Sequence, residues 1–278
     1  MKKLLLASTA LVACVAAAGA NAADLPAPVY KAPASAPAYN WTGTYGGLNL
    51  GYGWGTADDA QLGPSGDAAS RVFWNPAFIA GAAPSRFQLA PSGVIGGAQL
   101  GYNWQFGTWV WGLEADFQGA NITDSQSIST AGVGAFAPGS FSSSQNLDFL
   151  GTVRGRVGYT LVDRWLIYAT GGLAYGQVNY NLSFNFPGSN DFQSIATSRT
   201  DVGWTLGAGL EWALDGKWTA KAEYLYVDLG DRTFASLPGG RAANLATTLS
   251  ETFENRYSIV RVGLNYKLDW SGPLTARY

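Results

Sequence analysis

Histidine is missing altogether from this 278-residue chain, and cysteine occurs once. The missing histidine excludes Ser-His-Asp triads, histidine-ligated metal sites and histidine general bases. The one cysteine, Cys14, lies in the first apolar segment, so cleavage beyond it leaves no thiol and no disulfide. We therefore expect no enzymatic activity and no cofactor.

Long apolar runs are also missing after residue 23, where no stretch approaches the roughly 18 apolar residues that a membrane helix needs. The chain is therefore either soluble or a membrane barrel. Charge is low, at 13% of residues, and removal of Lys2 and Lys3 with a signal peptide leaves 15 basic against 19 acidic groups. This mild negative charge argues against a nucleic-acid partner.

The first 40 residues show two segments that do not belong to the fold. Residues 1–22 combine a basic start, an apolar run and a small-residue cleavage site, which predicts a secretory signal peptide. The sequence LVAC ending at Cys14 also fits a lipoprotein cleavage box, so lipidation there stays an alternative. Residues 23–40 are rich in Ala and Pro, which predicts a periplasmic tether.

From Trp41 onward, apolar and polar residues alternate with period two, which indicates strands with one apolar face. The predicted strands cover residues 41–54, 94–106, 109–119, 147–161, 165–180, 201–214, 218–229 and 257–268. Short connections alternate with long ones, which cover residues 57–91, 122–145, 183–199 and 230–254. This rhythm predicts an all-β fold, an eight-stranded antiparallel up-and-down transmembrane β-barrel over residues 41–268.

The polar face carries charges of both signs. They are Glu114, Asp116, Glu211 and Glu223 against Arg154, Arg156, Lys221 and Arg261. In a soluble barrel such as a lipocalin these residues would face water. Between the charges, however, the polar face holds Gly, Ala and Thr, whereas a water-facing wall holds more Lys and Glu. We therefore place the charges inside, as a paired network in the lumen; charges solvated one by one in a wet lumen are the alternative.

The apolar face carries aromatic side chains that are too bulky to converge in an eight-stranded lumen. Several flank the short connections: Trp104, Phe106, Trp109, Tyr159, Trp165, Trp212, Trp218 and Tyr266. Indole and phenol rings at such positions are typical of a membrane–water interface. On the strand 147–161 the same face includes Leu147, Phe149 and Val153.

The segments WTGTYGGLNLGYGWG, GTVRGRVGY, YATGGLAYG and KAEYLYVDLG resemble the small outer-membrane β-barrel surface proteins of alphaproteobacteria, the porin-family or outer-membrane immunogenic proteins. The resemblance implies an outer-membrane location, contact with membrane lipid and lipopolysaccharide, and insertion by the barrel assembly machinery. Some relatives bind haem. Such barrels finish on an aromatic residue of the last strand, whereas here a tail, residues 269–278, follows Leu268.

These observations predict a non-enzymatic outer-membrane surface protein. Its closed barrel, plugged by charge, would display four long extracellular loops that support envelope integrity and contact an extracellular ligand or a host surface. Two alternatives stay open: a narrow passive diffusion pore, and capture of a ligand such as haem by the loops.

Overall fold

The computed structural model describes residues 39–56, 60–162, 164–188, 191–240 and 247–268. The predicted signal peptide, nearly all of the predicted tether and the predicted C-terminal tail lie outside these ranges, so those three predictions remain untested.

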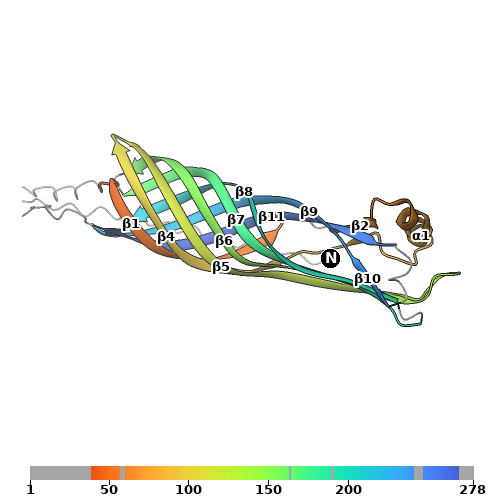
Figure 1. Ribbon diagram of the computed structural model, residues 1–278. Coiled ribbons are helices and arrows are strands. Elements are labelled where there is room, and N and C mark those ends of the chain that lie inside the picture. The colour runs from red at the N-terminus through yellow and green to blue at the C-terminus, as the bar shows by residue number, and fades with distance from the viewer. Residues whose placement is uncertain (1–38, 57–59, 163, 189–190, 241–246, 269–278) are drawn as a thin grey trace, which may run out of the picture. The chain divides into compact units, whose positions relative to one another are not determined.

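Eight long antiparallel strands close into a ring (Figure 1). They are β1 (Gly43–Gly55), β4 (Ser92–Phe106), β5 (Trp109–Thr130), β6 (Gly139–Val162), β7 (Trp165–Phe186), β8 (Asp191–Ala213), β9 (Trp218–Ala235) and β11 (Leu249–Leu268). Each strand pairs with its neighbours in chain order, and β1 pairs with β11 from Thr44↔Leu268 to Gly55↔Tyr257. The ring therefore has no unpaired edge, which is the condition for strands to cross hydrocarbon. The predicted eight-stranded barrel is confirmed.

The short connections lie at one end of the ring. Only two residues join β4 to β5, and Gly107 among them has a φ of 61°, a conformation that favours glycine over other residues. At this turn Phe106 pairs with Trp109, so the aromatic residues on both sides are brought together. The predicted tight hairpin is present.

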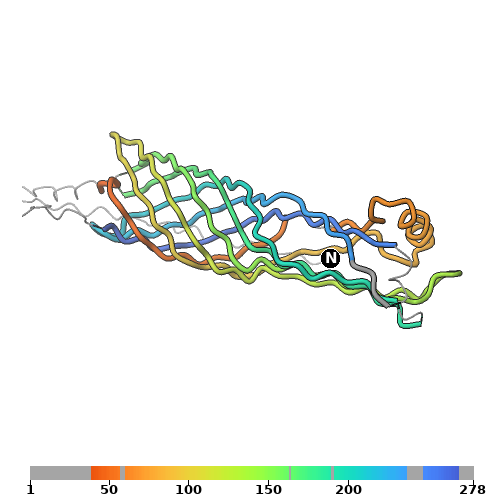
Figure 2. Tube along the Cα trace, in the orientation of Figure 1, coloured from red at the N-terminus to blue at the C-terminus, as the bar shows by residue number. Residues whose placement is uncertain are grey.

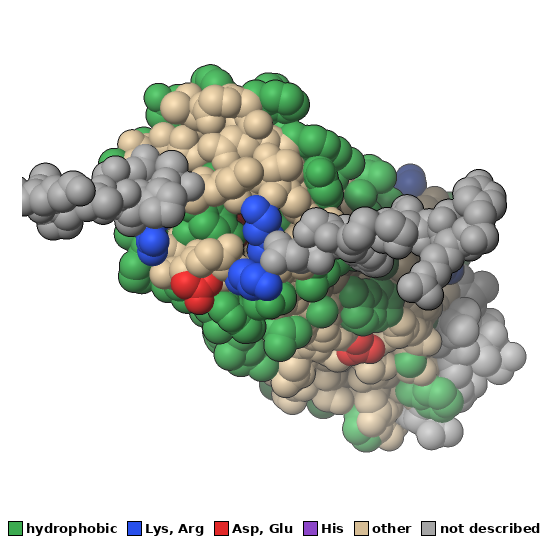
Figure 3. All heavy atoms as spheres, turned by 90° about the vertical axis from the view of Figure 1, so that its left-hand side faces the viewer, with side chains coloured by type: hydrophobic (Ala, Val, Ile, Leu, Met, Phe, Trp, Pro, Cys, Tyr) green, Lys and Arg blue, Asp and Glu red, His purple; other side chains and the backbone are tan. Residues whose placement is uncertain are grey.

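The outer wall of the barrel is apolar, as Figure 3 shows in a view from the end with the short turns. On β8, Trp204 and Leu206 are 49% and 59% exposed, whereas Glu211 is 2% exposed. The apolar face therefore points outward and the charged face inward, which is the arrangement of a membrane barrel and the reverse of a lipocalin.

The strands are longer than predicted, and three of the four predicted long loops are mostly strand. One of them, residues 230–254, contains the end of β9 and the start of β11, with a further short strand between them. Residues 122–145 contain the end of β5 and the start of β6, and residues 183–199 contain the end of β7 and the start of β8. Figure 2 shows both hairpins continuing away from the ring. Ser and Thr are frequent in these residues, and the inward positions are mixed: Phe141 and Leu182 are buried there, and so are Gln145 and Gln193.

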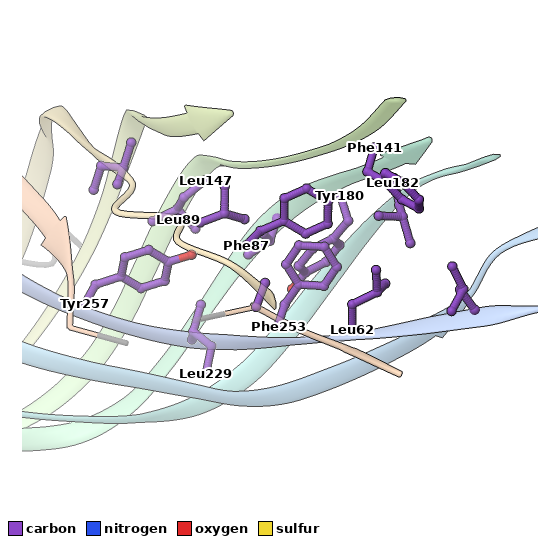
Figure 4. Close-up of a cluster of buried hydrophobic side chains, with 14 of the residues drawn as sticks. Leu62, Phe87, Leu89, Phe141, Leu147, Tyr180, Leu182, Leu229, Phe253 and Tyr257 are labelled. Carbon is purple, nitrogen blue, oxygen red and sulfur yellow. The ribbon is translucent and has the colours of Figure 1, made fainter. Parts of the chain in front are cut away.

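We call the part of β5 to β9 and β11 that continues past the outward-facing apolar band the extension. Its outward face is polar, with Thr123, Ser125 and Ser127 on β5. Its inward face is mostly apolar, and the buried cluster there includes Phe141, Leu182 and Phe253 among others (Figure 4), although Gln145, Glu251 and Asn255 are buried there as well. Within the chain, the polarity of the two faces thus reverses between barrel and extension, because the extension packs like a water-soluble domain.

A β-bulge explains why Leu147 does not lie where the alternation placed it. The pairing of β6 with β7 shifts between Leu147 and Phe149, so that β6 carries one extra residue there. An extra residue moves the following side chains to the opposite face. Leu147 is consequently fully buried inside instead of facing outward.

The connection from β1 to β4 is also structured. It contains β2 (Ala60–Pro64), α1 (Ala68–Ile79) and β3 (Arg86–Phe87), and β2 pairs with β11. The Asp67 side chain caps α1 by accepting a 2.6 Å hydrogen bond from the Ser70 backbone N–H. A further short strand, β10 (Leu237–Gly240), pairs with β8. None of the described helices is long and apolar enough to cross a membrane.

Candidate functional site

The eight charged residues of the predicted lumen network lie together inside the barrel. They are Glu114 and Asp116 on β5, Arg154 and Arg156 on β6, Glu211 on β8, Lys221 and Glu223 on β9, and Arg261 on β11. Strand register places opposite charges directly across from each other at Glu114↔Arg154, Glu211↔Lys221 and Glu223↔Arg261. Such cross-strand pairs are favourable, whereas like charges facing each other would repel.

Arg154 is the centre of the network and is 1% exposed. Its Nη2 lies 2.5 Å from Glu114 Oε1 and 2.9 Å from Asp116 Oδ2, and its Nη1 lies 3.1 Å from Glu223 Oε1. Its Nε donates to Thr152 Oγ1 at 2.9 Å. Every nitrogen of this guanidinium thus meets an oxygen, which offsets the large desolvation cost of a buried charge.

Arg261 and Lys221 extend the network across the lumen. Arg261 Nη2 lies 2.9 Å from Asp116 and 2.5 Å from Glu223. Lys221 Nζ lies 2.9 Å from Glu114 Oε1. Because β9 and β11 are not neighbours of β5, the Arg261–Asp116 and Lys221–Glu114 ion pairs cross the lumen, whereas Arg261–Glu223 joins adjacent strands.

Arg156 is held differently, between two tyrosine rings. Its guanidinium carbon lies 5.0 Å from the ring centroids of both Tyr45 and Tyr168. Nη1 of Arg156 lies 3.0 Å from Glu211 Oε2, and its Nε donates to Asn103 Oδ1 at 2.9 Å. Cation–π contacts of this kind strengthen when they are desolvated.

The two tyrosines also hydrogen-bond to the carboxylates. Tyr45 donates its hydroxyl proton to Glu114 Oε2 at 2.8 Å, and Tyr168 donates to Glu223 Oε1 at 3.0 Å. The alternation places Tyr45 on the inward face but does not assign it to the network. Tyr168 was not identified, because a tyrosine in a barrel strand is typical of the lipid-facing wall.

Side-chain amides continue the network on β1, β4 and β11. Asn49 donates to Gln99 Oε1 at 3.0 Å, and Asn265 donates to Glu211 Oε1 at 2.9 Å. Gln99 joins the two by donating to Asn265 Oδ1. These amides lie on the inward face that the alternation defines, and their polarity was the available signal. Their hydrogen bonds link the charged cluster to the strands that close the ring.

All eight predicted interface aromatics lie on the outer wall; six are exposed, and Trp165 and Tyr266 are partly exposed. Several pair across neighbouring strands near the short turns. Trp109 meets Tyr159 at 5.4 Å between ring centroids, and Trp218 meets Tyr266 at 4.9 Å. Trp165 stacks on Trp212 at 5.4 Å with an interplanar angle of 6°.

A second aromatic row, which the sequence analysis missed, lies farther along the same strands. It includes Phe117, whose ring lies 5.3 Å from Phe149, and Trp204, whose ring lies 5.5 Å from Tyr226. From Trp109 to Phe117 is nine residues of β5. A transmembrane strand needs about 9–11 residues, so the spacing of the two rows was the signal that could have revealed the second one.

The interior of the barrel holds a buried, salt-bridged charge network. Four carboxylates face four cations, so the network has no formal net charge. Among the residues that the structure describes, no group of three or more metal-ligating side chains could hold a metal ion.

Comparisons of the sequence with known protein families and relatives agree with this architecture. Residues 9–267 match the family model described as the outer membrane protein beta-barrel domain. The chain is 37% identical to the 31 kDa outer-membrane immunogenic protein of Brucella melitensis over 96% of its length and 100% of the relative. It is 30% identical to the 25 kDa outer-membrane immunogenic protein of Brucella abortus over 96% of this chain and 98% of the relative. Among solved structures it is similar to the outer membrane protein OprG from Pseudomonas aeruginosa, with 13% identity, coverage of 82% and 97%, and a TM-score of 0.46.

Proposed function

Because the chain belongs to the outer membrane protein beta-barrel family, we propose that it is a closed, non-enzymatic surface barrel. In this proposal the ion-pair network holds the lumen shut, the apolar wall sits among the lipids and lipopolysaccharide, and the extension is displayed outside the cell. The protein contributes to the envelope mechanically, as a rigid element of the outer membrane, and presents a structured surface to extracellular ligands or host cells.

The observation that carries the proposal is the network around Arg154. Its ion pairs join β5, β6, β9 and β11, so they cross the lumen in more than one direction. Passage of a solute would require separation of these pairs. An unpaired charge in such surroundings costs about 3–5 kcal/mol, which supports a closed barrel over a diffusion pore.

A second, apolar layer follows the charged one. On β9 the inward positions change from Lys221 and Glu223 to Leu225 and Val227, both fully buried. On β11 the inward Ile259, two residues before Arg261 in the sequence, is equally buried. Close-packed apolar side chains exclude water and ions, so this layer supports closure independently of the charges.

Conductance of the reconstituted protein in a planar lipid bilayer tests closure. We expect wild-type protein to insert without steady openings at moderate voltage. Steady single-channel openings of the wild type, with a conductance that changes in Arg154→Gln, would contradict the proposal and favour the diffusion pore.

The orientation follows from the rule that outer-membrane barrels keep short turns in the periplasm and longer segments outside. Two single-cysteine variants test it: Ser127→Cys, which is exposed in the extension, and Gly216→Cys, at the short connection between β8 and β9. With a membrane-impermeant maleimide on intact cells, we expect labelling of the first variant only. Wild-type protein serves as the control for Cys14, and labelling of Gly216→Cys alone would reverse the orientation.

A further inference from the structure

A cavity of about 230 Å³ lies beyond the extension, where segments far apart in the sequence meet. Its walls come from α1, from the connection between β5 and β6, and from the adjoining ends of β7 and β8. The residues on which the argument depends are Phe73, Trp74, Phe136, Phe186 and Asp191. The cavity is separate from the lumen network, and the proposed closed barrel makes no use of it.

The aromatic walls of the cavity support one another. The ring of Phe73 lies 5.0 Å from Trp74 and 6.0 Å from Phe136, both edge to face. Trp74 in turn lies 6.1 Å from Phe186. Rings from three separate segments are thus held in mutual contact, so the cavity is formed without a ligand. Pre-formed aromatic walls of this kind are typical of small-molecule sites.

Two polar atoms at the cavity have no hydrogen-bond partner in the described structure. They are the Nε1 of Trp74, a side chain that is 97% buried, and the Oδ1 of Asp191. Gln193, another lining residue, is fully engaged: its amide nitrogen donates to the Thr247 carbonyl and its oxygen accepts from Ser236. A buried carboxylate oxygen without a partner is unfavourable, and a cation or donor placed beside it relieves that penalty, whereas the Trp74 N–H is a donor and is satisfied only by an acceptor.

We propose that this cavity binds a small organic cation, with the ammonium group over the aromatic rings and Asp191 as its counter-ion. Aromatic rings attract cations within about 6 Å of their centroids, and groups of such rings recognise quaternary ammonium ligands. An anion would meet the Asp191 carboxylate and be repelled. A neutral apolar ligand would fill the cavity but leave Asp191 unpaired. The volume is below the roughly 300–1,000 Å³ of pockets for drug-sized ligands, so the ligand is a compact ammonium compound.

Choline and its uncharged analogue of the same shape, 3,3-dimethylbutan-1-ol, form a matched pair of probes. Full-length protein refolded in octyl glucoside and labelled with ¹⁵N-tryptophan gives an indole N–H signal for Trp74, assigned with Trp74→Phe. We expect choline to shift this signal saturably. The uncharged analogue should bind at least about fivefold more weakly than choline. Glycerophosphocholine distinguishes a free cation from a lipid headgroup. If it binds like choline, the natural ligand is a lipid headgroup; if it is excluded, the natural ligand is a free cation.

Two variants and one control complete the experiment. Asp191→Asn removes the counter-ion and keeps the shape, and we expect it to weaken choline binding about fivefold or more. Phe136→Leu removes an aromatic wall on a connection outside the barrel and should weaken binding as well. Asp231→Asn removes one carboxylate from an exposed ion pair of the extension and should leave binding unchanged. No saturable shift with choline, or equal binding of the uncharged analogue, would overturn the proposal and leave the closed barrel unaffected.

Discussion

Replacement of Arg154 by methionine tests whether the lumen charges act as one network. Methionine keeps much of the side-chain volume and removes the charge, so it leaves Glu114, Asp116 and Glu223 without their shared partner. Removal of one member of a buried ion pair costs about 3–5 kcal/mol in comparable cases. Arg261 and Lys221 still contact these carboxylates, so we expect a loss near the lower figure, about 3 kcal/mol.

Arg256→Met is the matched control on the same chain. Arg256 also contacts three acidic residues, Glu254, Asp228 and Asp231, but it is about one-third exposed in the extension. Exposed ion pairs have a median contribution of about 0–1 kcal/mol, and many contribute nothing measurable, so we expect this variant to lose about 1 kcal/mol in total.

The assay is urea-induced unfolding of protein folded in lipid vesicles, followed by tryptophan fluorescence, with the free energy of unfolding taken by linear extrapolation. The double variant Arg154→Met/Asp116→Asn restores a neutral lumen and should recover part of the loss, so that the two single effects are not additive. Equal, small losses for Arg154→Met and Arg256→Met would refute the network and favour charges solvated one by one in a wet lumen.

Three further predictions concern the close contact of strands, the extension and the lipid-facing wall. Gly172→Ala should lower the free energy of unfolding by about 1–3 kcal/mol in the same urea assay, because its Cβ would lie 2.1 Å from the Val153 carbonyl oxygen. Gly155→Ala is the control: its Cβ would lie 4.0 Å from the nearest atom, the Gly171 carbonyl oxygen, so the change should stay within about 0.5 kcal/mol. Burial raises the pKa of Glu251, in the extension, to about 8. An unfolded glutamate releases its proton near pH 4.3, so the free energy of unfolding should fall as the pH rises from about 4 to about 8. Glu251→Gln should flatten this fall. A pH profile of the variant that matches the wild type would contradict the assigned burial. Leu206→Arg should cost about 2–4 kcal/mol in vesicles, whereas Ser127→Arg in the extension should stay within about 0.5 kcal/mol; equal effects would mean that the apolar wall does not meet lipid.

The barrel and the side of its strands that faces the lumen could be predicted from sequence because both depend on local alternation. Glu114 and Arg154 alternate with apolar neighbours next to tight turns, and the structure places both inside. The outline of the network could also be predicted, since opposite charges that share the inward face of adjacent strands, such as Glu114 and Arg154, lie close enough to neutralise each other.

The extension could not be predicted in the same way. Its strands carry mainly Ser, Thr and Asn outward and mostly apolar residues inward, so here the apolar face is the inner one. Polar residues such as Gln145 and Glu251 also point inward, which weakens the alternation and makes the serine-rich stretch resemble a loop. Leu147 faces inward because of a bulge that depends on how β6 pairs with β7, which local sequence does not encode. Tyr168 was missed because burial of a tyrosine in the lumen depends on partners from other strands, here Arg156 on the adjacent β6 and Glu223 on the more distant β9.

The most direct test of a barrel with its apolar face outward is to measure whether lipid or water surrounds an outward position. A nitroxide label at Leu206→Cys and another at Ser127→Cys, in protein folded into vesicles, can each be exposed to oxygen, which concentrates in lipid, and to a water-soluble nickel chelate. If apolar side chains face lipid and the extension faces water, the label at position 206 relaxes with oxygen and not with nickel, and the label at position 127 does the reverse. Ready access of nickel to position 206 would contradict the membrane barrel.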